Sequence, residues 1–166
     1  DEYIWVTLDL CRLEREITDY VRHVIAAKYT VSAARVIIAT THTHSGPDIS
    51  FLNEGWERNR KKAEYRAYLT AQIFRAVDEC YEQGFLEADP YLVQGEVDGI
   101  YGKRNYKDEP GDKQVTMILF RTPNHVAAGI FHLTCHPTIL GINNMKISSD
   151  LLGEIGKELD ETYQTT

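Results

Sequence analysis

The stretch Arg35-Val36-Ile37-Ile38-Ala39-Thr40-Thr41-His42-Thr43-His44-Ser45-Gly46-Pro47 decides how the first part of this chain folds. Its apolar beginning predicts a buried strand, and Ser-Gly-Pro predicts a turn soon after that strand. An earlier strand-like stretch runs from Tyr3 to Leu10, and between the two strands apolar residues recur at helical spacing from Leu13 to Lys28. This order predicts a right-handed strand–helix–strand crossover, and therefore a parallel pair of strands.

The rest of the chain continues with a second helix, three strands and a last helix. We expect the helices at Asn59 to Gln83, closed by Gly84, and at Ser149 to Tyr163, with Ser149 as N-cap. The expected strands are Tyr91 to Val97, Val115 to Arg121 and Val126 to Cys135, the last two joined as an antiparallel hairpin. The sequence therefore predicts an α/β fold with a mixed sheet and flanking helices.

Composition argues against a nucleic-acid-binding protein and against a membrane-spanning one. The formal charge of −7 comes with no basic stripe, which argues against nucleic acid as a partner. No run of 18 apolar residues occurs, so no transmembrane segment is expected. The three cysteines, Cys11, Cys80 and Cys135, are odd in number and lie in apolar patterns, which predicts buried free thiols and leans towards a reducing compartment.

Two histidines one residue apart follow the strand that ends near Ala39. On an extended backbone His42 and His44 would point to the same side, just before the turn. Neutral imidazole is a good zinc ligand and a good proton-transfer group near neutral pH. The pair therefore indicates a metal or catalytic site, and the alternative is two polar residues at the mouth of a loop.

A third histidine is expected at another strand end. Proline cannot continue a strand ladder, so the strand that begins at Val126 should stop at His136, before Pro137, and leave the ring of His136 at the sheet edge. If this edge meets the first one, the rings of His42 and His136 should approach to roughly 3 to 4 Å to share one ion. The alternative is that His136 merely terminates a strand.

The heptapeptide Thr41-His42-Thr43-His44-Ser45-Gly46-Pro47, followed by His136-Pro137-Thr138, resembles the N-terminal catalytic domain of the neutral/alkaline (non-lysosomal) ceramidases. Ser148-Ser149-Asp150-Leu151-Leu152-Gly153 resembles the Ser-x-Asp-x-x-Gly stretch of that family. The resemblance extends from Ile4 to Gly153. It implies zinc-dependent hydrolysis of the N-acyl bond of a ceramide-like lipid or a related small amide.

The resemblance also implies roles for individual residues. His42 and His136 would be zinc ligands, and His44 would be a catalytic or substrate-orienting group beside the metal. Arg104, in Lys103-Arg104-Asn105, matches an arginine that the family has in Asn-Arg-Ser; it would bind the substrate or the oxyanion, or else be a solvated loop residue.

The family's remaining ligands, a glutamate and a tyrosine, and its serine would lie beyond Thr166. We therefore expect residues 1–166 to be a single domain or the N-terminal part of a larger catalytic domain. In the second case the rest of that domain would be a partner, and the isolated chain would be inactive and would bind zinc weakly.

Several alternatives stay open. Asp48 either caps the turn after His44 or touches substrate, and Asp150 either begins the last helix or also holds His136. The apolar stretch from Ile49 to Trp56 either lines a lipid groove or plugs the core. The chain as a whole could instead be a non-catalytic binding or regulatory domain, or a metal hydrolase for another amide or ester. Free thiols suggest a reducing compartment such as the cytoplasm, whereas members of this family are often secreted or membrane-associated. The compartment therefore stays open.

Overall fold

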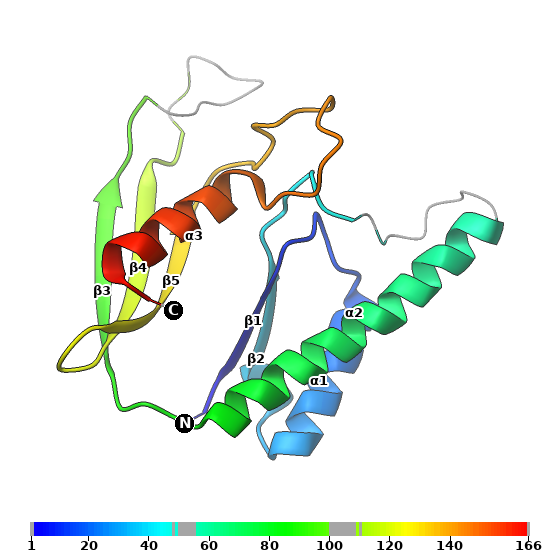
Figure 1. The fold of residues 1–166 in the computed structure, drawn as a ribbon, viewed down its shortest axis with the longest axis horizontal. Coiled ribbons are helices and arrows are strands. Elements are labelled where there is room, and N and C mark those ends of the chain that lie inside the picture. The colour runs from blue at the N-terminus through cyan, green and yellow to red at the C-terminus, as the bar shows by residue number, and fades with distance from the viewer. Residues whose placement is uncertain (1, 48, 50–55, 100–108, 110, 166) are drawn as a thin grey trace. The chain divides into compact units, whose positions relative to one another are not determined.

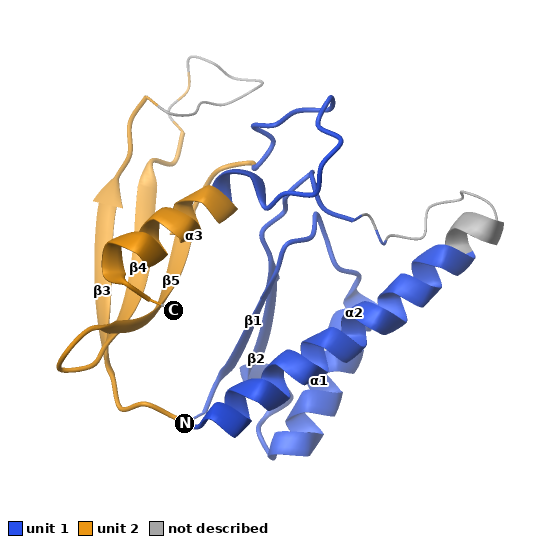
Figure 2. Ribbon diagram, viewed as in Figure 1, with its two compact units in different colours: residues 1–84, 137–152 blue, residues 85–136, 153–166 orange. Residues whose placement is uncertain are grey.

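The structure is a computed structural model that describes residues 2–47, 49, 56–99, 109 and 111–165 (Figure 1). The chain divides into two compact units, residues 1–84 with 137–152 and residues 85–136 with 153–166 (Figure 2). Helices and strands follow in the order β1 (Ile4–Leu8), α1 (Arg15–Tyr29), η1 (Ala33–Arg35), β2 (Val36–Thr40), α2 (Trp56–Gln83), β3 (Asp89–Glu96), β4 (Gln114–Arg121), β5 (Val126–Leu133) and α3 (Asp150–Tyr163).

The first unit is built on the parallel pair β1–β2. Its register runs from Ile4 opposite Val36 to Leu8 opposite Thr40, with α1 as the connection, so the predicted strand–helix–strand crossover is confirmed. In Figure 1, α1 and α2 lie alongside this pair. The core of the unit is apolar and consists of Leu10, Val21, Ile25, Val36, Ile49, Leu69, Ile73 and Val77. The four-residue spacing within each helix explains this burial, because residues i and i+4 share one helix face.

The second unit is an antiparallel sheet of order β3–β4–β5. The predicted hairpin between β4 and β5 is confirmed, and its turn is closed by a 2.9 Å hydrogen bond from the Thr122 amide to the His125 carbonyl oxygen. The α3 residues Gly156, Leu159 and Tyr163 face a small apolar cavity whose other wall comes from β4 and β5. The helix therefore covers one face of this hairpin.

The predicted helices are confirmed, with ends shifted by one to three residues. Helix α1 begins two residues after the predicted Leu13, and it ends before Thr30, whose φ of 57° is left-handed. Helix α2 begins three residues early and ends at Gln83 as predicted, followed by Gly84 at φ 83°. In the part of the chain that the structure describes, no helix is long and apolar enough to cross a membrane.

The α/β class is confirmed, but two details of the predicted sheet differ. Within the described residues, the parallel and antiparallel pairings belong to two sheets and not to one mixed sheet. Strand β5 ends at Leu133, so the prediction that it reaches His136 is wrong. The backbone turns away because the Cys135 amide bonds back to the Leu133 carbonyl at 2.9 Å, while the Thr134 hydroxyl donates to Asp112. His136 consequently lies in the loop after the strand.

Candidate metal centre

The carboxyl ends of β1 and β2 lie side by side, and their backbones stay bonded beyond the strands. The Thr41 amide donates to the Leu8 carbonyl at 3.0 Å, and the His42 amide donates to the Leu10 carbonyl at 3.1 Å. Cys11, the next residue after Leu10, is thereby held beside His42. Ligands of open α/β folds bind at this end of parallel strands.

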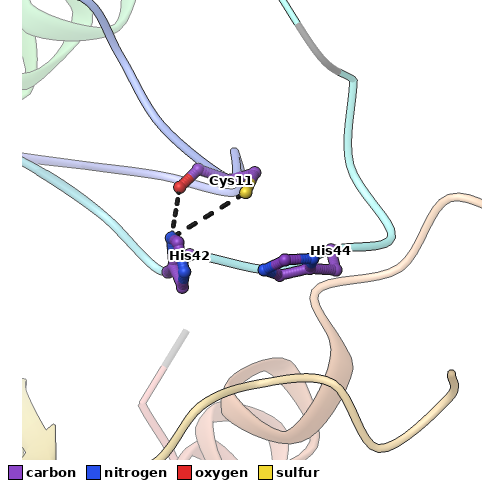
Figure 3. A group of neighbouring side chains, drawn as sticks. All are labelled: Cys11, His42 and His44. Carbon is purple, nitrogen blue, oxygen red and sulfur yellow. Dashed lines mark hydrogen bonds between the residues drawn. The ribbon is translucent and has the colours of Figure 1, made fainter.

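Cys11, His42 and His44 form a group that could hold a metal ion (Figure 3). One ligand atom from each residue can be chosen so that all three lie within 4.8 Å of one another. The two imidazole rings are 5.0 Å apart between centroids and nearly perpendicular, at 87°. Both histidines are exposed and Cys11 is partly buried, so an ion could reach the group from solvent. Imidazole nitrogen and thiolate sulfur are the usual ligands of zinc in proteins.

The backbone brings the two histidines together by a route that the sequence pattern does not predict. His42 has φ 62°, in the left-handed region, so the expected extended geometry at this residue is wrong. A non-glycine residue in this region costs roughly 1–2 kcal/mol, and such strain is often found at functional sites. The bond from its amide to Leu10 holds His42 in this conformation.

The carbonyl group of Cys11 orients the ring of His42. His42 Nδ1 lies 2.5 Å from the Cys11 carbonyl oxygen and 3.8 Å from Cys11 Sγ; both contacts are drawn in Figure 3. Because a carbonyl oxygen can only accept, Nδ1 carries the proton and donates it. The lone pair of the neutral ring is then on Nε2. Ligating histidines in metal sites are commonly fixed in this way through their other nitrogen.

The loop of residues 137–149 supports the histidine segment from the same unit. Thr43 is fully buried, and its hydroxyl donates to the Ser148 carbonyl at 2.8 Å. The same hydroxyl accepts the Ser45 amide at 3.2 Å, and the Ser148 amide donates to the Ser45 carbonyl at 3.1 Å. The His44 amide points at the Pro137 carbonyl, 3.4 Å away. Between two exposed histidines, Thr43 therefore acts as the anchor.

Gly46 is required by a close approach of two backbones. A Cβ atom at this position would lie 2.7 Å from the carbonyl oxygen of Asp9, just after β1. Real Cβ atoms are essentially never found so close to another heavy atom. The glycine of the His-Ser-Gly-Pro stretch thus lets the turn pass against the end of β1, next to the metal group.

Asp150 ties this loop to the start of α3. It is only 4% exposed, and its carboxylate accepts the amides of Ile139 and Leu140 at 3.2 Å each and that of Leu151 at 2.6 Å. The predicted place in the first turn of the helix is confirmed. Its carboxylate binds the backbone just beyond His136-Pro137-Thr138, and a bond to the ring of His136 stays a prediction.

The other predicted site residues are not brought into this group by the described structure. His136 is exposed and belongs to the second unit, so its approach to His42 stays a prediction. Arg104 and Asp48 lie outside the described residues, as do residues 50–55 of the apolar stretch. Their roles stay predictions too.

Cys11 is the residue that sequence reasoning missed. All three cysteines are thiols, as predicted, but the prediction that they are buried is wrong: Cys80 is exposed, and Cys11 and Cys135 are only partly buried. Cys11 lies beside the histidines. The signal was present in the sequence. Cys11 directly follows the first predicted strand, and the ends of parallel neighbours lie at one edge.

Comparison with known proteins finds no relative: no protein-family model, no curated protein and no solved structure matches this chain. The function proposed below therefore rests on the geometry of the Cys11–His42–His44 group and on the motif resemblance.

Proposed function

We propose that this chain contributes to a zinc-dependent amide hydrolase that resembles the neutral ceramidases and cleaves the N-acyl bond of a lipid-like or small amide. The observation that carries the proposal is the group of Cys11, His42 and His44 at the carboxyl end of a parallel strand pair. There, the Cys11 carbonyl orients the ring of His42 through Nδ1.

The donor set fits zinc. Imidazole nitrogen is a ligand that zinc accepts readily, whereas magnesium and calcium prefer oxygen. In the proposed site His42 and His136 are zinc ligands, and the remaining ligands come from a continuation of the chain beyond Thr166, as the resemblance implies. Bound zinc would supply a Lewis acid for the amide carbonyl and a water of lowered pKa.

The protein's own residues supply positioning and proton transfer. The ring centroid of His44 lies 5.0 Å from that of His42. In the proposed mechanism His44 would orient the substrate or carry a proton from the attacking water to the leaving nitrogen. Arg104 is proposed to donate hydrogen bonds to the oxygen that becomes negative as water adds to the carbonyl carbon. Cleavage of the C–N bond then yields a carboxylate and an amine.

The test uses the protein with its natural flanking sequence. Zinc content and hydrolysis of a fluorogenic N-acyl lipid amide are measured, with a short-chain amide and an ester as comparison substrates. We expect His42→Ala and His136→Ala to release zinc and abolish turnover. His44→Ala should keep zinc and slow turnover by about 10²–10⁴-fold, the usual contribution of a proton-transfer group.

The matched control is His23→Ala, which removes an exposed histidine of α1 in the same unit. It should change neither zinc content nor rate. Full activity of His42→Ala, or activity that survives exhaustive chelation, would refute the proposal. Zinc binding without hydrolysis of any of the three substrates would favour a non-catalytic binding domain, and hydrolysis of the ester alone would favour another metal hydrolase.

A further inference from the structure

The backbone, and not side-chain packing, fixes the place of Cys11. It follows Leu10, which is bonded through its carbonyl to His42 and through its amide to Leu8 at 2.9 Å. Both bonds belong to the paired ends of β1 and β2. The thiol is therefore presented beside His42 wherever this strand pair is formed.

The distances in the group are close to those of a zinc site. With Zn–S near 2.3 Å and Zn–N near 2.0 Å, a tetrahedral site has a sulfur–nitrogen separation of about 3.5 Å. The ligand atoms here lie within 4.8 Å of one another. Sγ lies 3.8 Å from His42 Nδ1, the nitrogen that donates to the Cys11 carbonyl, so the sulfur has to move towards Nε2 to share an ion with it. A change of rotamer at Cys11 moves Sγ by roughly 3 Å while the backbone stays in place. Rotation of the Cys11 side chain is therefore of the size needed to bring separations within 4.8 Å towards those of a zinc site.

We propose that Cys11 is a thiolate ligand of the metal ion that His42 binds. The inference rests on the proposed function in one respect, namely that a metal is bound at His42. On binding, the Cys11 thiol releases its proton to solvent and the sulfur lone pair forms the bond to the ion. The Cys11 carbonyl meanwhile keeps the bond to His42 Nδ1, so one residue both orients the histidine and shares its ion.

A sulfur ligand changes what the site would bind. The motif resemblance places two zinc ligands in this chain, His42 and His136, and Cys11 would add a thiolate to these two imidazoles. Thiolate favours zinc and other thiophilic ions over magnesium and calcium. The site should therefore take up Zn²⁺, Co²⁺ and Cd²⁺ in the presence of excess Mg²⁺.

The first test is spectroscopic, because Co²⁺ bound to thiolate gives an intense sulfur-to-metal charge-transfer band in the near ultraviolet. The protein with its natural flanking sequence is titrated with Co²⁺, and the Co²⁺ is then displaced by Zn²⁺. Cys11→Ser should abolish the band and weaken zinc binding by at least about 100-fold. Changing a residue that only hydrogen-bonds to a metal ligand typically weakens binding by about 10–100-fold. Cys80→Ser, which removes the exposed thiol of α2, is the control and should leave both unchanged.

The second test needs no variant and stays decisive if Cys11→Ser fails to fold. The wild-type protein is alkylated with iodoacetamide with and without Zn²⁺, and the rate at each cysteine is followed by mass spectrometry. Zinc should slow alkylation of Cys11 at least tenfold and leave that of Cys80 unchanged. Equal rates at Cys11 with and without zinc would overturn the inference.

The outcomes separate this inference from the proposed function. A thiolate–cobalt band and zinc protection of Cys11 without any amide hydrolysis would uphold the inference and refute the function. Chelator-sensitive amide hydrolysis in Cys11→Ser, with unchanged zinc affinity, would overturn the inference and leave the function standing. Failure of the wild-type protein to bind Co²⁺ or Zn²⁺ would overturn both.

Discussion

Replacing Asp150 should show how much of the support for the metal group comes from one buried carboxylate. The side chain is 4% exposed and accepts three backbone amides, two from the loop at Ile139 and Leu140 and one from Leu151 in α3. Its φ of 55° is left-handed, a conformation that aspartate and asparagine tolerate better than alanine. Asp150→Asn therefore tests the charge, and Asp150→Ala removes all three bonds.

The magnitude follows from these three bonds. A hydrogen bond to a charged group contributes about 1.5–3 kcal/mol net, but a buried carboxylate also has a desolvation cost of several kcal/mol. We expect Asp150→Ala to lower the free energy of unfolding by about 3–5 kcal/mol, because it removes three hydrogen bonds to a charged group and puts alanine in a left-handed conformation. At roughly 2–4 °C per kcal/mol for a chain of this size, Tm should fall by about 6–20 °C. Asp150→Asn, which keeps one acceptor oxygen, should cost about half as much.

Urea unfolding followed by circular dichroism measures the free energies, and calorimetry measures Tm. Glu158→Gln removes a carboxylate from the exposed face of the same helix, and it should change the free energy by no more than about 0.5 kcal/mol. A loss below about 1 kcal/mol in Asp150→Ala would refute the reasoning, because a buried carboxylate that accepts three amides cannot be removed so cheaply.

Three further predictions concern the first unit. Burial and a hydrogen bond to Glu2 raise the pKa of Tyr81 to about 12. The stabilising contribution of Tyr81 is therefore complete below pH 10 and is lost as pH rises towards 12. Spectrophotometric titration of Tyr81→Phe should show one phenol fewer ionising near pH 12, and an unchanged titration curve would contradict this. Hydrogen bonds from Lys28 and Tyr29 lower the pKa of Asp78. The ionised Asp78 therefore stabilises the folded state fully above its ordinary pKa near 4, and this stabilisation is lost as pH falls through its lowered pKa. Asp78→Asn should therefore flatten the acid limb of the urea-midpoint curve, and an unchanged limb would contradict this. His42→Gly should be more stable than His42→Ala by about 1 kcal/mol in urea unfolding, because only glycine adopts φ 62° without strain; equal stability would count against strain at this residue.

The fold was predictable where burial imposes a period on the sequence. Val21 with Ile25, and Leu69 with Ile73, recur at four-residue spacing because one face of each helix enters the core. Helix and strand ends were less predictable. Strand β5 stops at Leu133 because of a local backbone turn and a side-chain bond that reaches Asp112, 22 residues away. No periodic pattern contains information about such bonds.

The candidate site was predictable in part. His42 and His44 stood out because imidazole is a metal ligand and a proton-transfer group, and because the pair lies between a strand and a turn. Cys11 was missed because its position depends on the pairing of β1 with β2, which the sequence predicts as a topology and not as a register. The close approach of Gly46 to Asp9 has the same origin. What the sequence could not provide is the geometry at the end of two paired strands.

In the stretch from His42 to His44, the two histidines are the candidates for chemistry and Thr43 between them supports the local structure. His42 and His44 are exposed, so a change at either should alter metal binding or turnover while costing little stability. Thr43 between them is fully buried and bonded to Ser148, so a change there should cost stability first and activity only through the position of its neighbours. Backbone bonds at the strand ends hold Cys11 and His42 in place, and the partly buried side chain of Cys11 can change rotamer without moving the backbone. When such a site binds an ion, only side-chain entropy is lost, and this cost is small. The larger entropic cost of ordering the backbone is already offset when the first unit folds.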